Sequence, residues 1–265
     1  MSFSDYKTAL VTGASTGIGF AIAERLSREG ITVHGLGRSP AGLKQLAERT
    51  GCTTHVIDVT DTAALSGLVD GLEVDILVNN AGVSRAGNIL TSDQFDIDEQ
   101  IDVNLRAALQ LARLTVPGMI ERNRGHVVNI TSIAGHYEFG GHTVYHATKA
   151  AMHTVSRQLR IDAYGSDVRV TEICPGRVET DIFARVQKID PADARKQFFD
   201  DYDCPKPEDI ADAVAFAVSV PAYVNVGLIE ITPTRQVPGG LRTGKRSEFG
   251  HPERARDELA VADLA

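Results

Sequence analysis

Short apolar runs alternate with longer amphipathic stretches along most of this chain. The first run, from Thr8 to Thr12, is brief and suits a strand buried on both faces, and a helical periodicity follows it. The same pattern predicts strands at 8–12, 32–37, 55–57, 75–78, 126–130, 168–173 and 227–231. It predicts helices at 20–29, 43–49, 62–72, 95–122, 144–159 and 207–218. Strands that alternate with helices are typical of an α/β domain with a parallel sheet.

The alternation stops in two places. Residues 181–207 carry charges, aromatic residues and prolines after the sixth strand, and we expect them to form a mobile lid over a site. Residues 238–265 show no clear periodicity and are expected to form a C-terminal arm on the surface or on a neighbouring subunit. The pattern therefore predicts one catalytic domain, residues 1–237, without a repeat or a second domain.

Composition limits the choice of partners. The 265 residues carry a formal net charge of -8, which argues against binding to nucleic acid or to an anionic membrane. No apolar run is long enough for a membrane helix, and the N-terminus lacks the layout of a signal peptide. The three cysteines have no metal-binding spacing, so we expect reduced thiols, no metal ion and a cytoplasmic location.

A glycine-rich turn follows the first predicted strand. Gly13, Gly17 and Gly19 stand between strand and helix, where glycine allows a tight turn and brings backbone N–H groups close to a pyrophosphate. The spacing differs from the commoner Gly-x-Gly-x-x-Gly, but the order of strand, turn and helix predicts dinucleotide binding.

The end of the second strand indicates which dinucleotide. An NAD-binding unit usually has an acidic residue here, whereas this chain has Gly37 followed by Arg38 and Ser39. A guanidinium can hold a 2′-phosphate, and Ser15 and Ser39 can add hydrogen bonds, so we expect NADP(H). The alternative is that Arg38 caps a helix or faces the solvent.

Other candidate cofactor residues follow later strands. Asp58 could accept a hydrogen bond from the adenine amino group, although helix capping explains it almost as well. The tetrapeptide from Asn79 to Gly82 suits either a cofactor crevice or a simple turn. The remaining expected cofactor contacts are Thr16, Ile18, Val59, Asn80, Ala81, Pro175, Gly176, Val178 and Thr180.

Tyr145 and Lys149 are the strongest catalytic candidates. They lie four residues apart on a predicted helix and so share one face. A phenol has a pKa of about 10, and a nearby ammonium favours the phenolate. Tyr-x-x-x-Lys is a weak signal alone, and Asn104, which interrupts an apolar face, is more often a packing residue.

Taken in order, the motifs of this chain resemble those of the short-chain dehydrogenase/reductase family. They are Thr12-Gly13-x-x-x-Gly17-x-Gly19, Asn79-Asn80-Ala81-Gly82, Asn104, Ser132, Tyr145-x-x-x-Lys149 and Pro175-Gly176-x-x-x-Thr180. The resemblance implies a single Rossmann-type, doubly wound parallel sheet of seven strands, in the order 3-2-1-4-5-6-7 with helices on both faces. It also implies a homotetramer, or less often a dimer.

The resemblance assigns a role to each matching position. Tyr145 would be the acid/base, Lys149 would lower the pKa of Tyr145 and bind the nicotinamide ribose, and Ser132 would hold the substrate oxygen. Asn104 would anchor a water in a proton relay. Thr180 and the backbone near Val178 would orient the carboxamide. An NADPH-sensing protein without activity is the competing hypothesis, but such proteins generally lose the tyrosine or the lysine.

Two scaffold segments, residues 116–126 and 219–225, resemble a narrower subgroup of NADP-dependent serine/3-hydroxy acid dehydrogenases and sulfoacetaldehyde reductases. The expected substrate is therefore a small 3-hydroxy acid or acidic aldehyde; a sugar or another neutral carbonyl compound is the alternative. The expected substrate contacts are His136, His142, Arg177 and Arg185. Arg177 could grip a carboxylate or sulfonate, or could turn outward to pair with Glu179 or Asp181.

Overall fold

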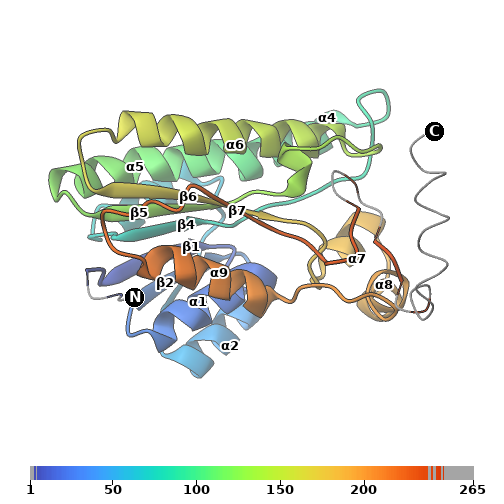
Figure 1. Ribbon diagram of the computed structural model, residues 1–265, viewed down its shortest axis with the longest axis horizontal. Coiled ribbons are helices and arrows are strands. Elements are labelled where there is room, and N and C mark those ends of the chain that lie inside the picture. The colour runs from blue at the N-terminus through green and yellow to red at the C-terminus, as the bar shows by residue number, and fades with distance from the viewer. Residues whose placement is uncertain (1–2, 4, 238–239, 241–242, 246, 248–265) are drawn as a thin grey trace.

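The computed structural model describes residue 3, residues 5–237, residue 240, residues 243–245 and residue 247. These residues form one parallel sheet with helices on both faces (Figure 1). The strand order is β3-β2-β1-β4-β5-β6-β7, as predicted. The strands are β1 (Thr8–Thr12), β2 (Thr32–Gly37), β3 (Thr53–Val56), β4 (Ile76–Asn79), β5 (Gly125–Ile130), β6 (Val168–Pro175) and β7 (Leu228–Ile231).

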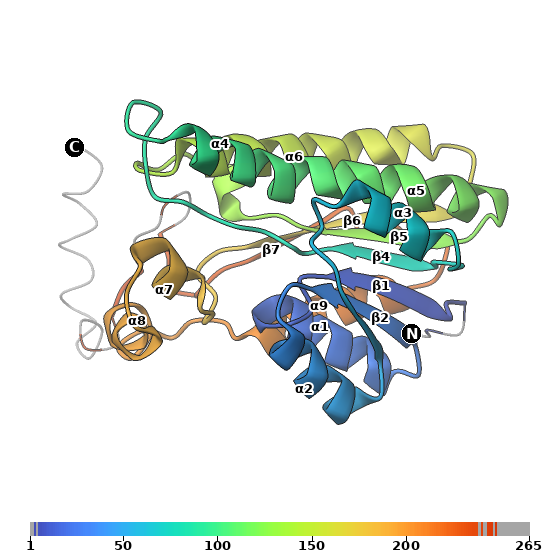
Figure 2. The same ribbon diagram turned by 180° about the vertical axis from the view of Figure 1, so that it is seen from behind.

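Nine α-helices are found among the described residues. They are α1 (Gly17–Arg28), α2 (Pro40–Thr50), α3 (Thr62–Val69), α4 (Gln94–Ile101), α5 (Ala107–Glu121), α6 (Thr143–Asp162), α7 (Ile182–Gln187), α8 (Pro191–Phe198) and α9 (Pro207–Ser219). Helices α1, α2 and α9 cover one face of the sheet, and α3 to α6 cover the other (Figures 1 and 2). Within the described part of the chain, no helix has both the length and the apolar character that crossing a bilayer requires.

Two hydrophobic clusters hold these layers together. One cluster joins α1 and α9 to the sheet through side chains such as Ile22, Leu26 and Val214. The other joins α5 to the opposite face through residues such as Leu111 and Met119. All eight residues of β6 are buried, as the double cover of a parallel sheet requires.

The structure differs from the sequence prediction in the long helix expected at residues 95–122. A π-helical turn, Asp102–Arg106, separates α4 from α5 without breaking the run. The inserted residue of such a turn changes the direction of the side chains, and π turns often occur at functional sites. Here the turn carries Asn104, which is buried.

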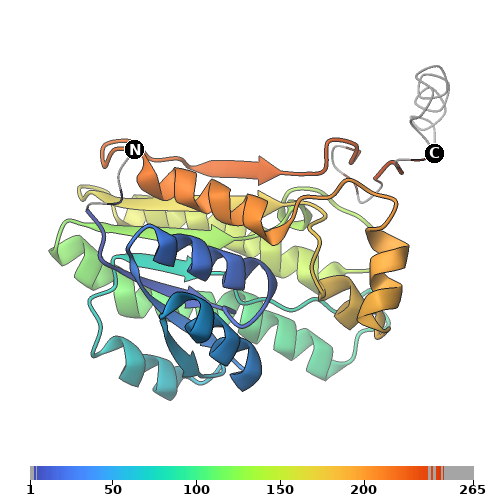
Figure 3. The ribbon, with the colours of Figure 1, turned by 90° about the horizontal axis from the view of Figure 1, so that it is seen from below.

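The expected lid contains two short helices. Helices α7 and α8 lie beyond the carboxyl ends of the strands, away from the main helical layers (Figure 3). Phe183 of α7 stacks on Phe198 of α8 with 5.0 Å between ring centroids. The C-terminal arm expected at residues 238–265 lies mostly outside the described residues.

Candidate cofactor and active site

A cleft of about 490 Å³ runs along the carboxyl ends of the strands. Turns that are far apart in the sequence meet there because all strands of a parallel sheet end at the same edge. Of the residues expected from sequence to contact cofactor or substrate, nearly all line this cleft; Gly19, Asn104 and His136 do not.

The glycine turn is shaped for a close approach. Gly13 and Gly17 have φ values of 67° and 57°, which favour glycine. A Cβ at Gly19 would lie 2.4 Å from the Gly13 carbonyl oxygen, so Gly19 keeps the turn closed without facing the cleft. Thr16 precedes α1 and makes no side-chain capping bond. The first turn of α1 thus presents backbone N–H groups and the positive end of a helix dipole at the cleft, which fits a pyrophosphate.

The far end of the cleft carries Arg38. Its guanidinium is 60% exposed, and Nη1 lies 3.7 Å from Oδ2 of Asp58. Burial alone would raise the pKa of Asp58, but two hydrogen bonds from Thr60 and the charge of Arg38 hold it below its ordinary value. Asp58 Oδ1 is already bonded by the Thr60 amide and hydroxyl at 2.9 and 2.8 Å. Asp58 therefore holds the turn after β3 in shape and also keeps Arg38 near the cleft.

The position of Gly37 has no room for an acidic side chain. A Cβ at this position would lie 2.9 Å from the Ser15 hydroxyl, so a side chain there would collide with the glycine turn. Ser39 was expected to bind the cofactor, and its hydroxyl accepts a hydrogen bond of 3.3 Å from the Gly42 amide as the N-cap of α2. A guanidinium beside a position closed to a carboxylate fits a 2′-phosphate.

Asn80 and Ala81 are held by the first strand. The Thr12 hydroxyl accepts hydrogen bonds from the amides of both residues at 2.9 and 3.0 Å, and Asn80 Nδ2 donates to the Thr12 carbonyl at 2.9 Å. These bonds tie the turn after β4 to the glycine turn. The bonds therefore fix the positions of Asn80 and Ala81 in the cleft wall.

Tyr145, Ser132 and Lys149 meet at the centre of the cleft. Lys149 Nζ lies 5.7 Å from the centroid of the Tyr145 ring. Burial raises the pKa of Tyr145, and the neighbouring Ser132 hydroxyl opposes that rise. In this structure the phenol is therefore protonated at neutral pH and suited to donate a proton.

Lys149 is only 5% exposed, and its Nζ donates a hydrogen bond of 3.0 Å to the Ile130 carbonyl. Burial lowers the pKa of Lys149 to about 8, although the charge of the Glu172 carboxylate acts in the opposite direction. A lysine with such a pKa keeps its charge at neutral pH and loses it in mild alkali.

Asn104 braces the site. Its Nδ2 donates to the Val83 carbonyl at 2.8 Å and to the Thr148 hydroxyl at 3.1 Å, and its Oδ1 accepts from the Val83 amide at 2.8 Å. The packing alternative is thus present, since both amide donors have protein partners. A Cβ at Gly82 would sit about equally far from Asn104 Oδ1 (3.5 Å) and Lys149 Nζ (3.6 Å). Glycine at this position leaves the space between those two atoms free of a side chain.

The turn after β6 closes the opposite wall with Pro175, Gly176, Val178 and Thr180. Its geometry depends on Gln236, which the sequence did not single out. Gln236 is buried, and its Oε1 accepts a hydrogen bond of 3.1 Å from the Arg177 amide. A Cβ at Gly176 would lie 2.5 Å from that same oxygen, which explains the glycine. Gln236 stands in an aperiodic stretch, so no local pattern marked it.

Arg177, His142 and Arg185 line the cleft, as the sequence predicted. The Arg177 guanidinium carbon lies 4.9 Å from the Tyr202 ring centroid and 5.8 Å from that of Phe183. Glu179, proposed as an outward partner for Arg177, instead pairs with Arg195. Phe139, Ile133 and Phe198, which the sequence did not indicate, add apolar surface.

His136 lies elsewhere. Its Nε2 is 3.1 Å from Glu172 Oε1, and the residue is not part of the cleft wall. The sequence placed it near the site because it follows Ser132 closely. The short 3-10 turn Ile133–Gly135 directs the chain behind β6 instead. The prediction that His136 contacts the substrate is therefore not supported, because its side chain contacts Glu172 outside the cleft wall.

Three comparisons place this chain among known proteins. The family model described as short chain dehydrogenase matches residues 7–190. The chain is 40% identical over 243 residues to an uncharacterized short-chain type dehydrogenase/reductase, y4eK, of Sinorhizobium fredii, with 91% of this chain and 97% of that protein covered. It is 36% identical over 240 residues to the NADP-dependent 3-hydroxy acid dehydrogenase YdfG of Salmonella typhi, with coverage of 88% and 97%.

Among solved structures, the closed form of serine dehydrogenase complexed with NADP+ is similar, with a TM-score of 0.83 and 35% identity. The alignment covers 90% of this chain and 99% of that one. The likeness thus extends over the sheet, the cleft and most of the remaining chain.

Proposed function

The chain belongs to the short-chain dehydrogenase/reductase family, and on that premise we propose that it is an NADP(H)-dependent dehydrogenase of small 3-hydroxy acids. It oxidises the hydroxyl group of such a substrate, for example serine, or reduces the corresponding carbonyl. The observation that carries the substrate class is the position of Arg177 in the cleft wall beside aromatic rings.

Bound NADP(H) accepts or supplies the hydride, and the protein provides one proton-transfer group and the positioning. In reduction, the Tyr145 hydroxyl gives its proton to the carbonyl oxygen; in oxidation, the phenolate takes the proton of the alcohol. Ser132, whose hydroxyl acts on the pKa of Tyr145, would donate a hydrogen bond to the same substrate oxygen. Lys149 keeps a positive charge beside the developing phenolate.

Asn104 acts by position in this proposal. By bonding Val83 and Thr148, it joins the wall after β4 to the helix turn that carries Lys149. The space beside Gly82 would admit a water between Asn104 and Lys149 for the proton relay that the resemblance implies. The homotetramer also implied by the resemblance stays a prediction.

Arg177 would bind the carboxylate. A partly buried guanidinium can grip two carboxylate oxygens at once, and its setting among Phe183 and Tyr202 strengthens that interaction by excluding water. His142, whose Nδ1 lies 3.5 Å from the Ser84 hydroxyl, also lines the cleft and would contact a polar substituent of the substrate. A neutral sugar has no anionic group with which the Arg177 guanidinium could pair.

The test is a panel of substrates with both cofactors. We expect NADP-linked activity on serine and related 3-hydroxy acids, and lower kcat/KM on neutral alcohols of the same size. Arg177→Leu should raise KM at least tenfold for the acids and little for the neutral analogues, since one charge-assisted contact typically contributes about 1.5–3 kcal/mol.

Arg195→Leu is the matched control, because Arg195 lies in the same segment, carries the same charge and does not line the cleft. Equal losses for acidic and neutral substrates in Arg177→Leu would show that the arginine supports the loop only. Absence of hydride transfer with every substrate, despite NADPH binding, would favour the sensing alternative.

A further inference from the structure

Behind the active site, Glu172 of β6 gathers three side chains around a buried carboxylate. Glu172 is 2% exposed, and its Oε1 accepts a hydrogen bond of 2.7 Å from the Thr131 hydroxyl. Nε2 of His136 lies 3.1 Å from the same oxygen, and Nδ1 of His153 lies 2.7 Å from Oε2. Nothing in the proposed hydride transfer uses these two imidazoles.

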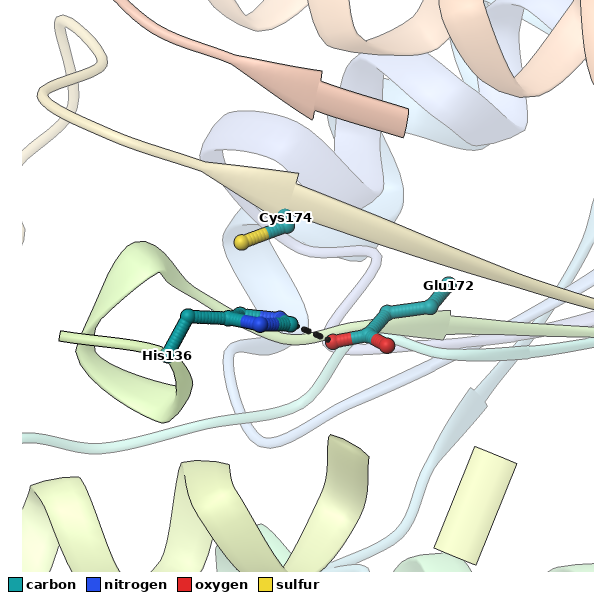
Figure 4. A group of neighbouring side chains, drawn as sticks. All are labelled: His136, Glu172 and Cys174. Atoms are coloured by element: carbon teal, nitrogen blue, oxygen red, sulfur yellow. Dashed lines mark hydrogen bonds and ion pairs between the residues drawn. The ribbon is translucent and has the colours of Figure 1, made fainter. Parts of the chain in front are cut away.

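Cys174 completes the group. It stands two residues after Glu172 on the same face of β6 and is fully buried. The ligand atoms of His136, Glu172 and Cys174 all lie within 4.8 Å of one another, and Figure 4 shows Cys174 beside the hydrogen-bonded pair of His136 and Glu172. His153 reaches the group from α6, with its ring centroid 4.2 Å from that of His136.

The chemistry of this set differs from that of an ordinary hydrogen-bonded cluster. An imidazole, a carboxylate and a thiolate together are the donors that Zn²⁺ and similar divalent cations prefer. Glu230, the strand partner of Cys174 on β7, brings a second carboxylate nearby. Burial and the carboxylates of Glu172 and Glu230 raise the pKa of the Cys174 thiol to about 12. The Cys174 thiol is therefore protonated in the metal-free protein, and a bound cation would have to displace its proton.

The spacing also suits a tetrahedral ion. Two nitrogen or oxygen ligands at about 2.0–2.1 Å from zinc lie about 3.3 Å apart, and a sulfur at about 2.3 Å lies about 3.5 Å from such a ligand. The His136–Glu172 separation of 3.1 Å is already close to the first value. The Cys174 sulfur, within 4.8 Å of both ligand atoms, would have to move closer to them to reach the second value.

We propose that His136, Glu172 and Cys174 form a binding site for Zn²⁺ or a similar divalent cation, and that His153, whose Nδ1 contacts the other oxygen of Glu172, shifts to supply the fourth ligand. The ligands come from the turn after β5, from β6 and from α6, so an ion would fasten these elements together behind the catalytic residues. The His136 and His153 side chains are 17% and 26% exposed and provide the route of entry. Binding releases the Cys174 proton to solvent, so affinity rises with pH.

Cobalt titration of the full chain tests this directly. Protein freed of metal by a chelator, and of any histidine tag, is titrated with Co²⁺ at pH 8. We expect one ion per chain, a thiolate-to-cobalt charge-transfer band in the near ultraviolet and the visible bands of a tetrahedral site. Zn²⁺ should abolish these bands by displacement and raise the Tm.

Cys174→Ser should abolish the charge-transfer band, and His136→Ala should weaken binding at least tenfold. His136 is only partly buried, so this second variant stays informative if Cys174→Ser fails to fold. Cys52→Ser, at a thiol remote from the cluster, should bind as the wild type does. His153→Gln distinguishes four protein ligands from three, because with three the affinity is unchanged and water fills the fourth position.

The proposal is overturned if wild-type protein shows no charge-transfer band at saturating Co²⁺, or if the band persists in Cys174→Ser. Either result would leave the cluster as a hydrogen-bonded network around Glu172. Because every readout is metal binding, the outcome is independent of the substrate assignment.

Discussion

Burial of the Lys149 ammonium in the active site should measurably lower the free energy of unfolding of the wild-type protein. The folded-state pKa is about 8, against an ordinary value of 10.5. Because the pKa falls on folding, the unfolded chain binds more protons between these values, and this residue makes stability rise with pH across that window. Below pH 8 the penalty is present in full. The difference of about 2.5 pKa units corresponds to about 3 kcal/mol.

Lys149→Met removes this penalty but also the hydrogen bond to the Ile130 carbonyl. Leaving a buried carbonyl without its donor costs about 1–3 kcal/mol. At pH 7 we therefore expect the inactive variant to be as stable as the wild type or up to about 2 kcal/mol more stable. By pH 10.5 it should be less stable, because the wild type has regained about 3 kcal/mol.

The assay is urea unfolding of both proteins, without cofactor, at intervals from pH 7 to pH 10.5. The informative quantity is the difference in unfolding free energy between variant and wild type, since other titrating groups cancel from it. Lys44→Met is the control for loss of a charge, because the Lys44 side chain is 79% exposed. A Lys149→Met difference that stays constant across this pH range would refute the reasoning.

Three further outcomes are expected. Tyr145→Phe should bind NADPH nearly as the wild type does, by fluorescence titration, and lose about a hundred- to ten-thousand-fold in kcat; near-normal turnover would contradict its role in proton transfer. Arg38→Asp should shift the ratio of kcat/KM values from NADPH toward NADH, and a wild type that uses both equally would disprove the assignment of Arg38. Gly19→Ala should lower both Tm and cofactor affinity, because its Cβ would overlap the Gly13 carbonyl; Gly67→Ala, with nothing within 4 Å of the new Cβ, should leave both unimpaired.

The sequence by itself determined the architecture. Strands buried on both faces leave short apolar runs, helices leave a period of 3.6, and glycine is needed where the turn after β1 approaches a ligand. These signals are local, and they locate the strands and helices along the chain. The strand order was implied by the family resemblance, and it agrees with the observed sheet. The four residues Asn104, Ser132, Tyr145 and Lys149 could be selected because their order and spacing along the chain carry the resemblance.

The tertiary structure decided which side chains share a partner. Local spacing suggested that His136 faces the substrate, but the turn after Ser132 brings it to Glu172. Gln236 stands far from Arg177 in sequence, yet its side chain holds the Arg177 amide. Such pairings depend on how β5, β6 and the last loop come together in space. Sequence periodicity and motifs do not show which distant residues come into contact. The cluster around Glu172 could therefore be identified only from the tertiary structure.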